Sequence, residues 1–289
     1  MATHRFTHRA MACEFGIAID GDDARYGRQA SDAAFEELGR LERLLSKFIP
    51  TSDIGQINSG PPGRPVVVSA ETAECLELAA QVWCDTRGAF DVTVGGIQAH
   101  TTAAVGMDYL QMDRRQRTAC RRVDGLAVDL GGIGKGYALD RLAELLRGWG
   151  IHRALLDSGQ STVLAMGEGW TVALRDPFDQ RSVLSQVVLC DCALAGSGAQ
   201  LHGQHIIDPQ TRRPASARAA AWAVAPSAAM ADALSTAFMV MKRNEIDRYC
   251  SEQPGTRALL WDEPGRFVAV GPSLAGCRFE MGSDADGER

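Results

Sequence analysis

Short apolar segments with the composition of β-strands recur along the chain, and many are separated by gaps too short to hold a crossover helix. They lie at residues 15–19, 65–68, 126–129, 154–157, 170–174, 183–189, 221–225, 258–261 and 267–270. Parallel neighbours need a long crossover connection, whereas antiparallel neighbours can be joined by a tight turn. The pattern therefore predicts an α+β fold with mixed, largely antiparallel sheets rather than a doubly wound parallel sheet.

About four amphipathic helices are expected to pack on these sheets. In the first, apolar residues at positions 34, 38, 41, 45 and 48 share one helix face, and the segment ends before Pro50. The second begins after Ser69, a residue type that caps helices well. The third covers about 136–149, where Gly150 closes it, and the fourth covers about 227–241.

The length of the chain and the absence of repeats set the expected domain organisation. With 289 residues and no long linker, we expect a single domain over residues 1–281, or two subdomains that share one cleft. Residues 282–289 contain no apolar residue larger than Ala. A disordered tail is expected there.

The charge balance excludes several classes of partner. The 36 Asp plus Glu exceed the 30 Lys plus Arg, giving a formal net charge of −6, so we expect no nucleic-acid partner. No apolar run is long enough to insert into a membrane, and the N-terminus lacks the apolar block of a secretory signal. The eight cysteines include no C-x-x-C pair. We therefore expect a cytoplasmic protein with reduced thiols.

The densest glycine cluster, DLGGIGKGYALD at residues 129–140, lies between an expected strand and the third helix. Glycines let the backbone approach a ligand closely, and the following helix N-terminus offers N–H groups to an anion. Lys135 adds a positive charge. The spacing matches neither a Walker A loop nor the full Rossmann motif. Two interpretations remain, a phosphate-binding loop and a tight strand-to-helix turn.

Two oxygen-bearing side chains lie four residues apart at the start of the fourth helix. Asp232 and Thr236 project from the same helical face. A carboxylate, a hydroxyl and backbone carbonyls form the kind of site that Mg²⁺ accepts. Alternatively, the acid complements the helix dipole and the threonine bonds back to a carbonyl.

Two further segments contain polar residues beside turn signals. In His205-Ile-Ile-Asp-Pro209, the histidine could take a proton from a hydroxyl, or it could be structural. Asp208 could orient that histidine or cap the turn at the proline. Asp91 and Thr93 lie beside glycines at a strand entry, and alone they indicate only a turn.

In their order along the chain, these segments resemble the bacterial flavin transferases of the ApbE family, which move FMN from FAD onto a protein hydroxyl. The resemblance covers about residues 11–241. Its motifs are LSKF at 45–48 with SDI at 52–54 and IN at 57–58, GAFDVT at 88–93, the glycine cluster at 129–140, HIIDP at 205–209 and ADALSTA at 231–237.

The resemblance implies a role for each candidate residue. It implies that FAD is the substrate, that AMP is released, that the acceptor is a Thr or Ser of a partner protein, and that Mg²⁺ is the cofactor. His205, as proton acceptor, and Lys135 would be catalytic. The metal ligands would be Asp232, Thr236 and the Gly134 carbonyl. The FAD-binding residues would be Met11, Asp91, Thr93, Gly132, Gly134, Lys135, Gly159, Ser197 and His205.

Two segments depart from the family pattern near the expected pocket. Gln160 and Ser161 stand where the family has a glycine and an aspartate, so a carboxylate is absent. Gly196 replaces a threonine, although its neighbour Ser197 is retained, and Gly134 replaces an alanine. Two alternatives to the transferase therefore stay open. They are an FAD pyrophosphatase that produces FMN and AMP, and an FAD-binding protein without catalytic activity.

Overall fold

A central antiparallel sheet of eight strands organises the molecule. The computed structural model describes residues 2–98, 104–176, 179, 181–198, 206–263, 266–273 and 277–281. The strands of this sheet are β1 Ala2–Ala10, β2 Cys13–Gly21, β6 Ala154–Ser158, β7 Thr162–Met166, β10 Ala193–Gly198, β13 Ala220–Ala225, β14 Arg257–Glu263 and β15 Arg266–Val270. They follow one another in the order β1–β2–β6–β7–β10–β13–β14–β15, and every neighbouring pair is antiparallel.

Smaller antiparallel sheets flank the central one. Their strands are β3 Val66–Val67, β4 Leu110–Asp113, β5 Thr118–Arg121, β8 Trp170–Arg175, β9 Val183–Leu189, β11 Ile207–Asp208, β12 Arg213–Pro214 and β16 Cys277–Met281. They pair as β3–β5–β4, β16–β9–β8 and β11–β12. Among the described residues, parallel strand pairing is limited to an isolated bridge between Val94 and Ala127. The predicted α+β class with largely antiparallel sheets is confirmed.

Seven α-helices lie within the described residues. They are α1 Ala24–Leu45, α2 Asp53–Ser59, α3 Ala70–Asp85, α4 Gly95–Gln98, α5 Gly134–Gly148, α6 Ala228–Val240 and α7 Arg243–Glu252, with a 3₁₀ turn at Met107–Tyr109. The four expected helices correspond to α1, α3, α5 and α6. None of the helices in this part of the chain has the length and apolar character of a membrane span.

The bounds of α1 differ from those predicted at both ends. The helix begins ten residues earlier than the apolar stripe, because the Asp23 side chain accepts hydrogen bonds from the backbone N–H groups of Arg25 and Tyr26 at 2.9 and 3.0 Å. It ends at Leu45, so Phe48 is not on its buried face and is 82% exposed. A capping residue can start a helix in a polar segment that has no apolar periodicity. The apolar pattern alone therefore placed the start of this helix too late.

One predicted strand is wrong, and the cysteines are as expected. Residues 126–129 form no strand, because their pairing is limited to the bridge of Ala127 with Val94. All eight cysteines are free thiols. Cys190 and Cys192 lie in the turn between β9 and β10.

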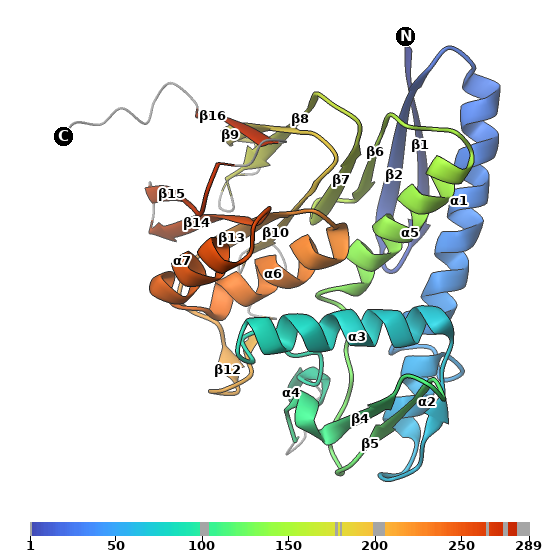
Figure 1. Cartoon of the computed structure of the whole chain (residues 1–289), viewed down its shortest axis with the longest axis vertical. Helices are drawn as coiled ribbons and strands as arrows, with labels where there is room; N and C mark the ends of the chain where they lie inside the picture. Colours follow the sequence, from blue (N-terminus) through green and yellow to red (C-terminus); the bar gives the residue numbers. More distant parts are fainter. Residues whose placement is uncertain are drawn as a thin grey trace.

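The central sheet separates two hydrophobic cores. Helices α1, α5 and α6 cover one face and enclose the larger core, while the β8–β9–β16 sheet packs against the other face (Figure 1). Alternation along β10 shows this division: Ala193 and Ala195 belong to the larger core, whereas Leu194 belongs to the smaller one. Strand β10 is therefore buried on both faces.

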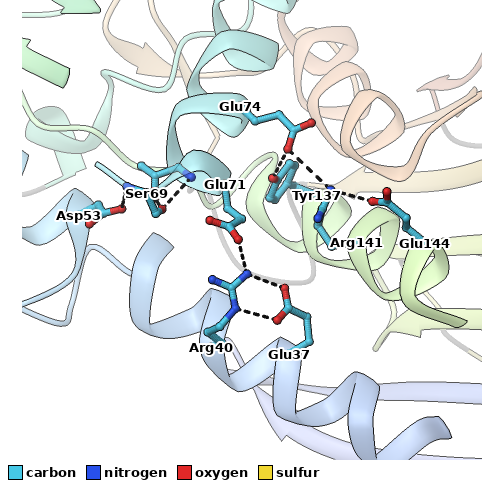
Figure 2. Close-up of polar contacts among 10 residues, drawn as sticks. Glu37, Arg40, Asp53, Ser69, Glu71, Glu74, Tyr137, Arg141 and Glu144 are labelled. Carbon is cyan, nitrogen blue, oxygen red and sulfur yellow. Dashed lines mark hydrogen bonds and ion pairs between the residues drawn. The ribbon is translucent and has the colours of Figure 1, made fainter. Parts of the chain in front are cut away.

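Helix α3 crosses in front of the α1 and α5 ends and is tied to both by carboxylates, as Figure 2 shows. Glu71 pairs with Arg40 of α1, which also binds Glu37. Glu74 accepts a hydrogen bond of 2.6 Å from the hydroxyl of Tyr137 on α5. The helix that follows the glycine cluster is thus fixed to its neighbours through a residue of the cluster itself.

Candidate functional site

Several turns meet at one end of the central sheet. The β1–β2 turn at Met11 lies there because Phe15 pairs with Ser158 at the end of β6. The β6–β7 turn lies beside the end of β10, since the Gly196 N–H donates to the Ser161 carbonyl at 2.7 Å. Strand register therefore gathers predicted residues from distant parts of the chain at one sheet edge.

The Met11 turn is held in a restricted conformation. Met11 and Ala12 both have positive φ, +49° and +62°, as a two-residue type I′ hairpin connection requires. Glu42 of α1 accepts a hydrogen bond of 2.7 Å from the Met11 backbone N–H. Non-glycine residues at positive φ are strained and cluster at functional sites.

Helices α5 and α6 cross closely at Gly136. A Cβ on this residue would lie 2.1 Å from the carbonyl oxygen of Ala228, so only glycine permits this approach. Asp140 of α5 then accepts hydrogen bonds from the backbone N–H groups of Ala228 and Ala229, at 2.7 and 2.8 Å. The glycine cluster and the Asp232 helix form one unit.

Asp232 is a buried carboxylate whose polar contacts are neutral. Its Oδ2 accepts a hydrogen bond of 3.1 Å from the Gly136 N–H, and its Oδ1 accepts one of 3.2 Å from the Thr162 hydroxyl. The residue is 4% exposed. It forms no ion pair within the described ranges. A buried charge without a counter-charge is costly, so this position favours a bound cation.

Thr236 lies between the glycine cluster and β10. A Cβ on Gly132 would be 3.2 Å from Thr236 Oγ1 and 3.3 Å from a ring carbon of Phe90. Thr236 Oγ1 is 3.4 Å both from Ser197 Oγ and from the Asp232 carbonyl oxygen. These distances exceed those of good O–H···O hydrogen bonds, so the hydroxyl is available to a stronger partner.

Lys135 extends back over the first turn of its own loop. Its Nζ donates to the Gly131 carbonyl at 2.9 Å, and no carboxylate pairs with it in the described part of the chain. Burial raises the pKa of the nearby Cys13 thiol, whereas the charge of Lys135 lowers it and Asp232 raises it. Lys135, Asp232 and the β1–β2 hairpin therefore lie within electrostatic reach of one another.

Asp91 and Thr93 form a turn beside the glycine cluster, and the Thr93 hydroxyl also accepts a hydrogen bond of 2.8 Å from the Gly106 N–H. Asp91 Oδ1 accepts from both the backbone N–H and the hydroxyl of Thr93, at 2.7 and 2.5 Å. Burial raises the pKa of Asp91, against the opposing effect of the Thr93 hydrogen bonds. The Asp129 N–H donates to the Val92 carbonyl at 2.7 Å. This turn thus supports the cluster through backbone contacts.

Two residues that contact the candidate site, Lys47 and Thr162, were not predicted from the sequence. Lys47 donates a 2.6 Å hydrogen bond to Asp129 Oδ2, and the other oxygen of Asp129 accepts from the Gly131 N–H at 2.9 Å. Lys47 belongs to the LSKF motif, and its charge was the available signal. No local signal marked Thr162 as a partner of Asp232.

The histidine segment is described only in part. His205 lies outside the described residues. Asp208 accepts hydrogen bonds of 2.9 Å from the Gln210 N–H and 2.8 Å from the Thr211 hydroxyl. Of the two roles considered for this acid, the structure shows it capping the turn.

A cavity of about 230 Å³ opens at the same end of the sheet, and Gly159, Gln160, Ser161, Gly196 and Ser197 are among its lining residues. Both departures from the family pattern therefore lie on one cavity. The described residues, those around Asp232 included, contain no group of three or more His, Cys, Asp or Glu side chains that could hold a metal. A cation beside Asp232 would depend on one carboxylate together with hydroxyl and carbonyl oxygens.

The fold is that of known flavin transferases. The structure of the ApbE protein of Thermotoga maritima matches with a TM-score of 0.83 at 24% identity, over 93% of this chain and 97% of that one. The flavin transferase ApbE from Vibrio cholerae matches with a TM-score of 0.78 at 22% identity, over 98% and 99% of the two chains. These likenesses establish the fold class.

The sequence comparison defines the family. The ApbE family matches residues 11–260, and this chain belongs to that family. Relatives named FAD:protein FMN transferase include one from Escherichia coli strain K12, 28% identical over 89% of this chain and 86% of its own length. Another, from Klebsiella pneumoniae, is 27% identical over 85% of this chain and 80% of its own length. The resemblance inferred from the motifs is confirmed.

Proposed function

We propose that this protein transfers FMN from FAD to a Thr or Ser hydroxyl of an acceptor protein, releases AMP and requires Mg²⁺. Family membership and the names of the relatives support the transferase activity. One observation carries the placement of the site. The buried carboxylate of Asp232, without an ion-pair partner in the described chain, contacts the Gly136 N–H of a lysine-bearing glycine loop.

The oxygen atoms around Asp232 fit a hard cation. Each carboxylate oxygen accepts one hydrogen bond from the protein, which leaves further lone pairs on both. Asp232, Thr236 and the Gly134 carbonyl would hold Mg²⁺, which prefers oxygen ligands. When bound, the ion would neutralise negative charge on the pyrophosphate.

The remaining residues would position the dinucleotide. Lys135 and the backbone N–H groups at the start of α5 provide positive potential for the phosphates. In the reaction the acceptor oxygen forms a bond to the FMN phosphorus, and the bond from that phosphorus to the bridging oxygen breaks, so AMP leaves. The hydroxyl proton passes to a base, for which we propose His205.

The test uses purified protein, FAD, Mg²⁺ and a flavin-accepting domain, with covalent fluorescence of the acceptor as the readout. Asp232→Asn should lower transfer at least about 100-fold, because one charged ligand of a hard cation is replaced by a neutral amide. Asp247→Asn, which alters an exposed acid that pairs with Arg243 on α7, is the matched control and should retain activity.

Three outcomes would contradict parts of this proposal. Wild-type transfer by Asp232→Asn would show that the metal site is placed wrongly. AMP release without any acceptor would instead support an FAD pyrophosphatase. Retention of intact FAD in the presence of Mg²⁺, with neither AMP nor labelled acceptor, would indicate a protein that only binds FAD.

A further inference from the structure

Lys47 contacts the glycine cluster from outside it. The residue lies in the turn that follows α1, where the Ser52 hydroxyl donates a hydrogen bond of 2.5 Å to the Ser46 carbonyl. Its Nζ is 2.6 Å from Asp129 Oδ2, and the side chains of Lys47 and Asp129 are only 25% and 14% exposed. Salt screens a partly buried pair of this kind less than it screens a surface pair. The ion pair joins two segments that are 82 residues apart in the chain.

The polar contacts continue from Asp129 into the glycine cluster. Asp129 Oδ1 accepts a hydrogen bond of 2.9 Å from the Gly131 N–H, and the Gly131 carbonyl accepts one of 2.9 Å from Lys135 Nζ. One chain of contacts therefore runs from Lys47 through Asp129 and Gly131 to Lys135. The side chain that we propose to contact the phosphates is the last member of this chain.

The backbone on the two sides of Asp129 is restrained to different degrees. Before it, the Asn58 side chain donates to the Val128 carbonyl at 2.8 Å and accepts from the Val128 N–H at 2.7 Å. After it, glycines occupy positions 131, 132, 134 and 136. Glycine loses more conformational freedom on folding than any other residue, so this loop depends on restraints from outside. The Asp129 carboxylate provides one at the first glycine.

The positive charge of Lys47 has a second effect on the same carboxylate. Without a counter-charge, Asp129 would present a negative charge beside the Gly131 N–H, and it would repel an approaching phosphate. Lys47 compensates this charge at Oδ2, while Oδ1 remains on the loop N–H. A neutral residue at position 47 could do neither as well, because hydrogen bonds between charged groups are the stronger ones.

We propose that Lys47 is a positioning residue for the phosphate-binding loop, and that it acts through Asp129 rather than by contact with the substrate. The inference depends on the proposed function, which assigns the phosphates to Lys135 and the start of α5. When Lys47 is removed, the Asp129 carboxylate loses its charged partner. The Gly131 peptide then loses the restraint that orients its carbonyl toward Lys135 Nζ.

The experiment measures the binding of inorganic pyrophosphate by calorimetry, without FAD or acceptor. Lys47→Met should weaken this binding at least about 5-fold, within the range of coupling between members of one polar network. Lys47→Arg retains a cation that can pair with Asp129 and should stay close to wild type. The matched control is Lys242→Met, because Lys242 is exposed and its backbone N–H donates to Glu245 at the start of α7. It should bind pyrophosphate as wild type does.

An Asp129→Asn background separates a positioning role from direct contact with the anion. The asparagine keeps an oxygen for the Gly131 N–H but has no charge for Lys47 to compensate. In this background Lys47→Met should change the pyrophosphate affinity by less than about 2-fold. An undiminished loss there would overturn the proposal, because Lys47 would then contact the anion itself. Wild-type affinity of the single variant Lys47→Met would overturn it as well. If Lys47→Met fails to fold, Lys47→Gln replaces it under the same criteria.

Failure of this inference can be distinguished from failure of the proposed function. If the pyrophosphate affinities follow the expected pattern but no acceptor is ever labelled, the positioning role of Lys47 stands and the transferase activity does not. If wild type labels an acceptor while Lys47→Met binds pyrophosphate as tightly as wild type, the transferase activity stands and the positioning role does not.

Discussion

At the scale of single residues, Gly136 determines how closely α5 and α6 approach. A Cβ at this position would overlap the Ala228 carbonyl oxygen at 2.1 Å and the Ala229 nitrogen at 2.8 Å. Both of these are backbone atoms, which cannot rotate away as a side chain would. The contact between the Gly136 N–H and Asp232 exists because nothing larger than hydrogen stands between the helices.

Gly136→Ala should therefore lower the free energy of unfolding by at least about 2 kcal/mol, as overpacking forces the helices apart. Gly148→Ala is the matched control on the same helix, since a Cβ there meets nothing within 4 Å. It should raise stability by about 0.5–1 kcal/mol through helix propensity. Urea unfolding measures both changes. Equal effects of the two substitutions would refute the role assigned to Gly136.

Two single residues make contacts that could not be predicted from the sequence. The sequence shows that Gly196 lacks the hydroxyl of the family's threonine, and the structure adds that a Cβ there would lie 2.6 Å from the ring of Trp222 on the paired strand. Lys47 could be recognised as part of a motif, but not as the partner of Asp129. Both relationships depend on strand register and chain packing, which local patterns do not specify.

At the scale of elements, Asp140 joins the two helices that form the site. Its carboxylate accepts hydrogen bonds from the backbone N–H groups of Ala228 and Ala229 at the start of α6. The Ser227 hydroxyl caps the same helix by accepting a hydrogen bond from the Met230 N–H. Burial raises the pKa of Asp140 to about 6, against the opposing effect of those N–H groups. The link between the helices is therefore sensitive to pH.

The sign of that sensitivity follows from proton linkage. A folded pKa near 6, against the ordinary aspartate value of 3.8, means that the folded chain holds this proton more tightly than the unfolded chain. The contribution of Asp140 to stability is then greatest below about pH 4 and falls as pH rises through about 6. The fall is at most about 3 kcal/mol. The Asp140→Asn variant has no titratable carboxyl at this position and therefore lacks this pH dependence.

The measurement is the free energy of unfolding of wild type and Asp140→Asn at several pH values between 4 and 7. The wild-type curve should decline relative to the variant curve as pH rises through this window. Parallel curves, or a wild-type curve that rises relative to the variant, would contradict the raised pKa.

Helices were easier to predict than strands for a local reason. The hydroxyl of Ser69 accepts the Thr72 N–H at 3.1 Å, and Gly150 has φ +74°, so both expected caps operate as expected. Strand β10 was not predicted. Its sequence ALAGSG has low strand propensity, and pairing with β7 and β13 on its two edges holds it in place.

At the scale of the whole molecule, one core connects all the layers on the helical side of the central sheet. It runs from Phe6 in β1 through Val82 in α3 and Leu110 in β4 to Val270 in β15. A continuous core of this kind provides no surface along which the chain could separate into two independently stable parts.

We therefore expect residues 1–281 to unfold as one cooperative unit. Tryptophan fluorescence and far-ultraviolet circular dichroism should give coincident urea transitions with one midpoint. The probes are well distributed, since Trp83 is in α3, Trp170 in β8 and Trp261 in β14. Two separated transitions would instead show two subdomains around a shared cleft.

The hydrogen bond from Gly136 to Asp232 spans 96 residues of chain, and this separation has a consequence during synthesis. A nascent chain that already contains the glycine cluster with Lys135 still lacks the Asp232 carboxylate that contacts it. While α6 remains inside the ribosome, the growing polypeptide cannot form the cation site that we propose at this position. Competence for chemistry should therefore arrive late, after most of the sheet has been made.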